Sequence, residues 1–358
     1  MKNQVVILVM FFSFFVVANT AYSQPDNYDT VLDLLKKITM PGEITDPLWW
    51  QLKSKAQASL IAMGEDAVET LLWIANDEVQ PMRIKLFALG ALAEMRCKEA
   101  MPIIIKHLSS QSETVRWDAI ECLGILGTEE AVKLLLDIAE NGLKVENSGM
   151  ADIYAIEAIQ KVINPTATAE LKKALKSENN NVVGAVQKAL ANIPTKEAFE
   201  ALATTLSDKR YGVRKTAAVV LSTVPMRESI ELLKNALKAE KENEYMQLEL
   251  ALSLTKLGDG TSGKILRELA VNGSELDVRG RAVDALAEVS DTSAVPLIMK
   301  FLNEESTIRA HAVCALGKLG DASVVPALEK IAKDDRIEPL REAARASIEQ
   351  IKARVDSN

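Results

Sequence analysis

A helical hairpin that recurs at intervals of 29 to 36 residues constrains the fold of this chain more than any other feature of its sequence. The clearest copy is residues 306–335, STIRAHAVCALGKLGDASVVPALEKIAKDD. In its first half, apolar residues follow one another at i, i+4, i+7, i+8 and i+11, the spacing that gathers side chains on one face of an α-helix. Gly320 ends this helix, and Asp321 or Ser323 caps the next one. A hairpin of this size cannot bury its apolar faces alone, so it needs neighbours of the same kind.

The copies are aligned on one position, the residue equivalent to Ile308, which we call the marker. The markers are Leu52, Pro81, Val115, Ala151, Val182, Val213, Met246, Val278, Ile308 and Leu340. Two helices of about a dozen residues and two short turns fill one interval, whereas the period-2 alternation typical of strands is absent. The sequence therefore predicts an all-α solenoid of about ten stacked helical hairpins.

Two kinds of residue are expected to make the turns inside the repeats. Gly64, Gly127, Gly258 and Gly320 offer the left-handed conformation that ends a helix. In three consecutive repeats, Pro165, Pro194 and Pro225 stop one helix and start the next.

The ends of the chain differ from the repeats. Residues 1–23 combine Lys2, an apolar run of 13 residues and the small residues Ala21 and Ser23, a pattern typical of a signal peptide. A run of 13 is short against the roughly 20 residues that span a bilayer. We therefore expect residues 24–46 to form a lead-in with a capping helix, residues 47–358 to form the solenoid with a C-terminal capping helix from about Pro339, and no membrane insertion after cleavage.

The charge of the mature chain argues against a nucleic-acid partner. Removing Lys2 leaves 41 basic and 50 acidic residues, a balance of 41 − 50 = −9. An acidic surface repels the phosphate backbone unless a local basic strip overrides it, and no long run of Lys and Arg occurs.

At this point the repeats identify a family. Segments such as VRWDAIECLGILG (115–127), VRGRAVDALAEV (278–289) and IRAHAVCALGKLG (308–320) share their opening and their Ala and Leu positions. This pattern resembles the HEAT-like repeats first grouped with phycobilisome lyases, and it covers roughly residues 47–352. The resemblance implies a right-handed superhelix of antiparallel helix pairs whose marker helices line the concave side. It also implies binding of proteins in most members, and catalysis or nucleic-acid binding in a minority.

A basic residue follows the marker in most copies. The arginines are Arg116, Arg214, Arg279, Arg309 and Arg341. In related repeats this arginine forms a ladder with acids in the turn before it, and such acids occur here, among them Asp208 before Arg214 and Glu304 before Arg309. We interpret the set as a structural ladder. The alternative is a basic strip for an acidic ligand. The ladder residue is missing at Asp152, Val183 and Gln247.

Aromatic residues are the candidates for binding. All four tryptophans lie in the first third of the chain, and tryptophan is enriched at interface hot spots. Trp49 and Trp50 suit an end cap of the stack. The binding candidates are Trp73, Trp117, Tyr154, Tyr211 and Tyr245, with capping or gap filling as the alternative for each.

No catalytic, cofactor or metal site is predicted. An iron hydroxylase built on HEAT repeats uses His–Glu pairs, but here His107 precedes Leu108 and His311 precedes Ala312. The chain has no glycine-rich phosphate loop and no nucleophile elbow. Among the three cysteines, Cys97 falls in a turn and is expected to be accessible, while Cys122 and Cys314 fall in helices.

The sequence thus favours an exported, periplasmic or secreted, non-catalytic scaffold that binds a protein. The alternatives are an enzyme, an accessory subunit or regulator of an enzyme, a nucleic-acid binder, and a binder of an envelope polysaccharide.

The signal peptide is directly testable. We expect N-terminal sequencing of the protein recovered from the extracytoplasmic fraction to begin at Gln24, because Ala21 and Ser23 occupy the positions that a signal peptidase reads. Recovery of a chain that retains residues 1–23 would contradict export by cleavage.

Overall fold

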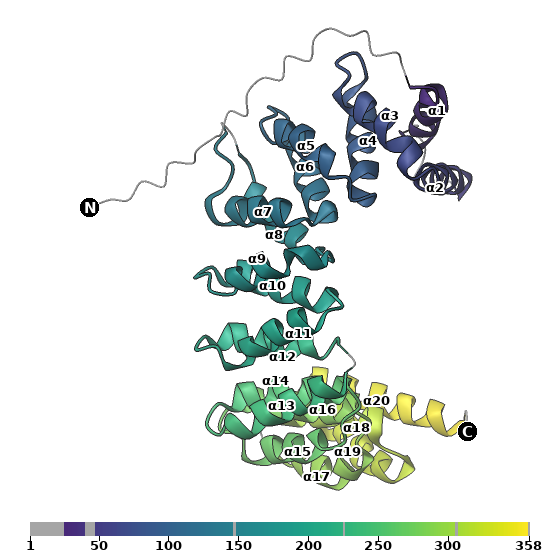
Figure 1. The fold of residues 1–358 in the computed structure, drawn as a ribbon. Coiled ribbons are helices and arrows are strands. Elements are labelled where there is room, and N and C mark those ends of the chain that lie inside the picture. Colours follow the sequence, from purple (N-terminus) through teal and green to yellow (C-terminus); the bar gives the residue numbers. More distant parts are fainter. Residues whose placement is uncertain (1–24, 40–46, 146–147, 225, 305–306, 357–358) are drawn as a thin grey trace. The chain divides into compact units, whose positions relative to one another are not determined.

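The computed structural model describes residues 25–39, 47–145, 148–224, 226–304 and 307–356, as twenty α-helices, five short 3₁₀-helices and turns, with no strand among them. The all-α prediction is therefore confirmed. The signal segment 1–23 and part of the lead-in 24–46 lie outside the described residues. The chain divides into two compact units, residues 1–95 (unit 1) and 96–358 (unit 2) (Figure 1).

Unit 1 is built around its first helix. Its helices are α1 (Tyr28–Thr39), α2 (Pro47–Ala62), α3 (Glu65–Asn76) and α4 (Met82–Glu94). Val31 and Leu35 of α1 are fully buried, and α1 packs on α2, α3 and α4. The side chain of Asn27 accepts a hydrogen bond from the Thr70 hydroxyl and donates to the Asp66 carbonyl at 2.5 Å, which attaches the start of α1 to α3.

Unit 2 consists of eight helix pairs. Its α-helices are α5 (Met101–Leu108), α6 (Glu113–Leu126), α7 (Glu129–Asn141), α8 (Ala151–Gln160), α9 (Thr168–Ala174), α10 (Asn180–Asn192), α11 (Lys196–Thr204), α12 (Tyr211–Leu221), α13 (Arg227–Ala239), α14 (Glu244–Lys256), α15 (Ser262–Asn272), α16 (Leu276–Glu288), α17 (Val295–Phe301), α18 (Thr307–Leu319), α19 (Val325–Asp334) and α20 (Glu338–Asp356). Of the helices that the structure describes in either unit, none is long and apolar enough to cross a membrane.

The pairs of unit 2 stack through their marker helices. Each even-numbered helix from α6 to α20 begins near a marker, and each one up to α18 packs on the next even-numbered helix, as α6 does on α8 and α16 on α18. We call these helices the marker layer. The odd-numbered helices form a second layer, and successive pairs lie side by side in Figure 1.

The core lies between the two layers, on the face that the repeat pattern predicted. In α18, Ile308, Ala312 and Leu316 are fully buried, and Leu328 of α19 is fully buried as well. They belong to one continuous apolar cluster that runs from α14 to α20. Each repeat therefore contributes a thin strip to a shared core, as stacked hairpins require.

The turns follow the prediction at two glycines and depart from it at two others. Gly127 and Gly258 have φ of +55° and +76° and follow the ends of α6 and α14, as the prediction requires. Gly64 also has a positive φ, +54°, but its ψ of −131° lies outside the left-handed helical region, and it caps the start of α3. The expectation for Gly320 was wrong, because its φ lies outside that region. A Cβ at Gly320 would instead collide with the Val324 side chain and approach the Leu316 carbonyl oxygen to 2.7 Å, so close packing requires glycine here. Pro225 lies outside the described residues.

Several pairs contain a 3₁₀ turn that the sequence analysis did not foresee. The Asp321 carboxylate accepts from the Ser323 amide at 2.8 Å and caps the 3₁₀-helix Ala322–Val324, after which α19 begins at Val325. Asp291 and Asn164 cap the equivalent 3₁₀-helices Thr292–Ala294 and Pro165–Ala167. The predicted cap is therefore present, but it acts on the turn that leads into the helix.

The shared core predicts local rather than global effects of a truncation. Leu316→Ala should lower the free energy of unfolding by about 2–5 kcal/mol, because it opens a cavity in a fully buried site. Hydrogen exchange should show lost protection mainly in α16 to α20. Lys330→Ala, at an exposed position of α19, is the control. Equal loss of protection across all repeats of unit 2 would contradict this expectation.

Candidate protein-binding surface

The ladder arginines connect successive repeats. Three of them pair with an acid in the turn before the next marker helix: Arg214 Nε with Glu240 at 2.7 Å, Arg279 Nη2 with Glu304 at 2.9 Å, and Arg309 Nη1 with Asp335 at 3.2 Å. The acids expected in the preceding turn were the wrong partners at these positions. Since each pair joins one repeat to the following one, these contacts set the stacking of neighbours.

The preceding turn contributes backbone carbonyls instead of carboxylates. Arg116 Nη1 donates to the Ser110 carbonyl at 2.7 Å, and Arg214 Nη1 donates to the Asp208 carbonyl at 2.9 Å. Arg341 Nη1 makes the same kind of bond to the Asp335 carbonyl at 2.5 Å, and Arg341 also pairs with Glu338. At one position without arginine, Gln247 Nε2 donates to the Glu240 carbonyl at 2.6 Å.

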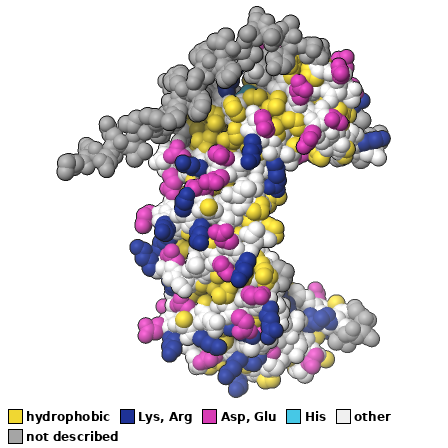
Figure 2. Space-filling view, in the orientation of Figure 1, with side chains coloured by type: hydrophobic (Ala, Val, Ile, Leu, Met, Phe, Trp, Pro, Cys, Tyr) yellow, Lys and Arg dark blue, Asp and Glu magenta, His cyan; other side chains and the backbone are white. Residues whose placement is uncertain are grey.

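The surface charge is mixed. On the face in view in Figure 2, Lys and Arg side chains of unit 2 are interspersed with Asp and Glu. Nucleic-acid binding depends on a continuous basic strip. Over the described residues on this face, no such strip is formed.

Two of the predicted aromatic residues come together on the marker layer. Trp117 of α6 stacks on Tyr154 of α8, with ring centroids 5.4 Å apart and an interplanar angle of 23°. Trp117 is nevertheless 44% exposed, and Met150 and Ile153 beside Tyr154 are about half exposed. We call Trp117, Tyr154, Met150 and Ile153 the tryptophan patch. A large, pre-ordered apolar surface of this kind is typical of an interface hot spot.

A carboxylate without a cation lies beside the tryptophan patch. Burial raises the pKa of Asp118, and the nearby charge of Glu121 raises it further. Glu121 itself pairs with Lys161 at 2.9 Å. Within the described ranges no cation pairs with Asp118, so this half-buried carboxylate lacks the neutralising partner that such groups usually have.

Trp73 is placed differently from Trp117. It lies in α3 of unit 1, where its ring meets Tyr28 edge to face at 5.0 Å and 86°. Trp73 is partly buried and packs against its own unit, whereas the side chains of Trp49 and Trp50 lie outside what the structure describes.

The other predicted tyrosines form a second patch. Tyr211 is the first residue of α12 and Tyr245 is the second of α14, and they are 36% and 37% exposed. Burial raises the pKa of Tyr211, which lies within the electrostatic reach of Lys215, Glu249 and Tyr245. We call Tyr211 and Tyr245 the tyrosine patch.

Glu249 beneath the tyrosine patch joins three marker helices. Glu249 is 5% exposed, and its carboxylate pairs with Lys215 of α12 at 2.8 Å and with Arg281 of α16 at 2.7 Å. Burial by itself would raise the pKa of Glu249, but the hydrogen bonds from Arg281 and Lys215 outweigh burial and hold the pKa below its ordinary value. Sequence reasoning missed this cluster, because its members lie 32 and 34 residues apart.

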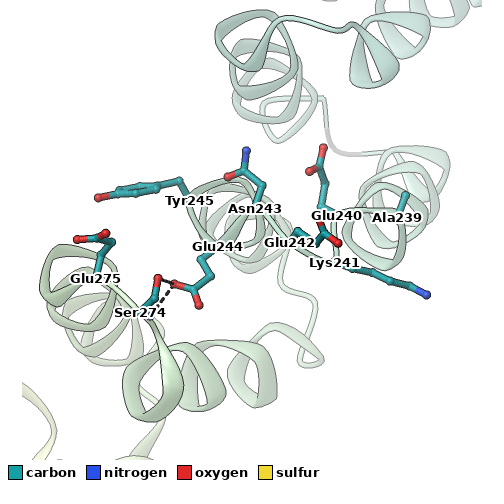
Figure 3. Close-up of a pocket in the computed structure, with 9 residues that line it drawn as sticks. All are labelled: Ala239, Glu240, Lys241, Glu242, Asn243, Glu244, Tyr245, Ser274 and Glu275. Carbon is teal, nitrogen blue, oxygen red and sulfur yellow. Dashed lines mark hydrogen bonds between the residues drawn. The ribbon is translucent and has the colours of Figure 1, made fainter.

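An open hollow of about 710 Å³ adjoins the tyrosine patch. Its lining is Ala239, Glu240, Lys241, Glu242, Asn243, Glu244, Tyr245, Ser274 and Glu275. Figure 3 shows the Tyr245 ring above Glu275 and the Glu244 carboxylate turned to Ser274, which donates to it through its amide at 2.8 Å and its hydroxyl at 2.9 Å. Glu240 is held by Arg214, but no cation of the described chain pairs with Glu242 or Glu275. The hollow is therefore acidic.

Histidines and cysteines do not assemble a reactive site. His311 Nδ1 lies 2.9 Å from the Asp284 carboxylate, a partner that sequence reasoning missed, and His107 Nδ1 bonds the Ile103 carbonyl at 2.8 Å. Cys97 is buried, which contradicts its expected accessibility, whereas Cys314 is exposed. Among the residues that the structure describes, no group of three His, Cys, Asp or Glu side chains is arranged to hold a metal ion.

The comparisons with known proteins point to one family. The sequence matches the family of HEAT repeats over residues 68–146, 141–222 and 264–349. Similar solved structures are an engineered protein (19% identity, 90% of this chain and 98% of that chain, TM-score 0.36), human deoxyhypusine hydroxylase (20%, 75% and 97%, 0.29) and the CpcE–CpcF complex of phycocyanin lyase from Nostoc (19%, 70% and 94%, 0.34). No curated protein matches the chain significantly.

The Glu249 cluster predicts a pH-dependent stability. Glu249→Gln should lower the free energy of unfolding by about 1–3 kcal/mol at pH 7, because two charge-assisted hydrogen bonds are weakened. The folded-state pKa lies below the unfolded value of about 4.3, so this stabilisation is present above that value and is lost as the pH falls through the folded pKa.

Urea denaturation of the wild type and of Glu249→Gln, at pH 7 and at pH 3, measures the pH dependence of this stabilisation. The two midpoints should differ at pH 7 and approach each other at pH 3. Glu268→Gln, at an exposed position of α15, should change neither midpoint. An equal gap at both pH values would show that charge is not what Glu249 contributes.

Proposed function

The chain belongs to the HEAT-repeat family, and from that premise we propose that it is a non-catalytic scaffold that binds another protein on the marker layer of unit 2. Members of this family mostly bind proteins, and the repeat scaffold presents a row of parallel helix faces to a partner. The function thus depends on those places where individual repeats depart from the common pattern.

One observation carries the proposal, the stacking of Trp117 on Tyr154 at an exposed face. An indole packed on a neighbouring ring has already lost its rotamer freedom, so binding costs little further entropy. Met150 and Ile153 enlarge the apolar surface, and Asp118 and Glu121 provide a polar rim. An apolar centre with a polar rim is the usual anatomy of a protein interface.

The absence of a catalytic role is part of the proposal. The strongly interacting polar groups of the marker layer are engaged with one another, as in the Glu249 cluster and the ladder arginines. A catalytic centre needs reactive groups that converge on a space for substrate. The Glu249 cluster and the ladder arginines instead join one repeat to the next.

An extracytoplasmic location is the second part of the proposal. It is supported by the signal-type segment of residues 1–23, with its apolar run of 13 residues before Ala21 and Ser23. The partner would then be another exported protein or a component of the envelope, which includes the subunit of an exported enzyme.

A polysaccharide of the envelope is the alternative ligand that the same observation favours. An exposed indole stacked on a second ring offers an apolar plane to a sugar ring as well as to a peptide. If the wild-type chain captures a glycan and Trp117→Ala abolishes that capture, the ligand is a polysaccharide and not a protein.

The test is affinity capture with residues 24–358 as bait on the native envelope fraction, with a photo-cross-linking amino acid in place of the exposed Thr114, which lies one helical turn before Trp117 on α6. We expect a cross-linked protein, and a loss of at least about 2 kcal/mol, roughly 30-fold in affinity, when Trp117 is replaced by Ala. Ile105→Ala is the matched control, because Ile105 is 46% exposed on α5 of the other layer. Capture that is unaffected by Trp117→Ala and Tyr154→Ala would reject the proposed surface.

A further inference from the structure

We propose that the tryptophan patch and the tyrosine patch together bind one extended basic segment of the protein partner, a stretch with two clusters of Arg or Lys side chains. This inference rests on the proposed function, because it names the chemistry of the partner that the scaffold binds. It adds the charge, the conformation and the spacing of the bound segment.

Both patches lie on the same layer of the same unit. Trp117 and Tyr154 belong to α6 and α8, and Tyr211 and Tyr245 belong to α12 and α14. All four rings are at least partly exposed in the marker layer. The faces of Trp and Tyr rings attract guanidinium and ammonium groups, most strongly where water is partly excluded.

Carboxylates without cations accompany the tryptophan patch. Asp118 follows Trp117 directly, and Glu157 lies one helical turn beyond Tyr154 on the same face of α8. Among the described residues neither is paired with a cation, and half-burial makes a charged partner for Asp118 favourable. An arginine stacked on Trp117 would bring its guanidinium within reach of that carboxylate.

The tyrosine patch has the same combination of rings and acids. Glu275 lies under the Tyr245 ring and Glu242 lines the adjoining hollow (Figure 3). Three of the nearby cations are engaged, Lys215 and Arg281 by Glu249, and Arg214 by Glu240. Lys241 also lines the hollow, but its side chain points away from Tyr245 (Figure 3). The carboxylates that remain without a cation in the described chain therefore select a basic ligand at this second position as well.

The surface between the patches leaves room for a backbone. Gly184 of α10 and Gly212 of α12 carry no side chain, and a Cβ at Gly212 would meet nothing within 4 Å. At Gly212 no side chain obstructs a segment that crosses from one patch to the other, and at Gly184 the nearest side chain, that of Thr216, would lie 3.9 Å from a Cβ. We infer an extended segment rather than a helix, because an extended chain covers about twice the distance per residue.

The distance between the patches sets the spacing of the basic clusters. Three helix-to-helix steps separate the α6–α8 pair from the α12–α14 pair, and packed helices lie about 8–10 Å apart, which gives about 24–30 Å. An extended chain covers about 3.3 Å per residue, so about eight residues bridge the patches. A spacer of two residues is too short to bridge them.

Synthetic peptides test this spacing against charge alone. Each fluorescent peptide carries two Arg-Arg clusters joined by a Gly/Ser spacer of two or ten residues, so that the total charge is the same and the outermost arginines of the short form are only about 17 Å apart. Residues 24–358 should bind the ten-residue form at least tenfold more tightly in fluorescence anisotropy, because only that form engages both patches. Trp117→Ala or Tyr245→Ala should bring the ten-residue form down to the affinity of the two-residue form.

Glu268→Gln is the control for a general loss of negative charge, and circular dichroism verifies that each variant is folded. Glu275→Gln should weaken binding of the ten-residue form several-fold, whereas Glu268→Gln should not. Equal affinity for both spacers, or no binding of either, overturns the inference. If the cross-link at position 114 still captures a partner in that case, the proposed function stands and only the basic segment is rejected.

Discussion

The contact between one marker helix and the next is the interaction on which this protein depends. Each hairpin exposes a strip of Val, Ile, Leu and Ala that it cannot cover by itself, and the following hairpin covers it. Small residues such as the fully buried Ala312 allow the helices to approach closely. Apolar burial is not directional, so it does not by itself fix how one repeat is aligned with the next. Three ladder arginines supply that alignment, because each pairs with an acid in the turn before the next marker helix.

The same constraint determines where function can be placed. Positions between the helices are occupied by the core, and the ladder positions are occupied by contacts to turns. The outward face of the marker layer is free to vary, and there the repeats differ: Trp117 in one, Tyr154 in the next, Gly184 in a third, and Lys215 and Glu249 in the following ones. In a repeat protein, the buried positions of a helix thus maintain the scaffold, while the exposed positions of the same helix can bind a ligand. The family assignment, which depends on the scaffold positions, therefore does not identify a partner.

The fold was predictable because helical periodicity is a local property. The buried set of α18 follows from spacing alone, and the positive φ angles of Gly127 and Gly258 follow from glycine at the end of a helix. What could not be predicted depends on neighbours in space. Trp117 and Tyr154 were each candidates, but their stacking requires the spacing of α6 and α8. The acids of the ladder were assigned to the wrong turn, because both turns carry acids and sequence does not show which one the side chain reaches. Gly320 and the buried Cys97 were misjudged for the same reason.

The Glu249 cluster has a consequence for how such a chain can evolve. Repeat proteins lengthen by duplicating a unit, and a unit held only by apolar contacts can be copied or deleted without regard to its neighbours. Glu249 takes one cation from the repeat before it and one from the repeat after it. A copy inserted on either side would separate the acid from one of its partners and leave a charge buried and half neutralised. We therefore expect the three repeats of α12, α14 and α16 to be kept together, and growth or loss of repeats to be easier elsewhere in the array.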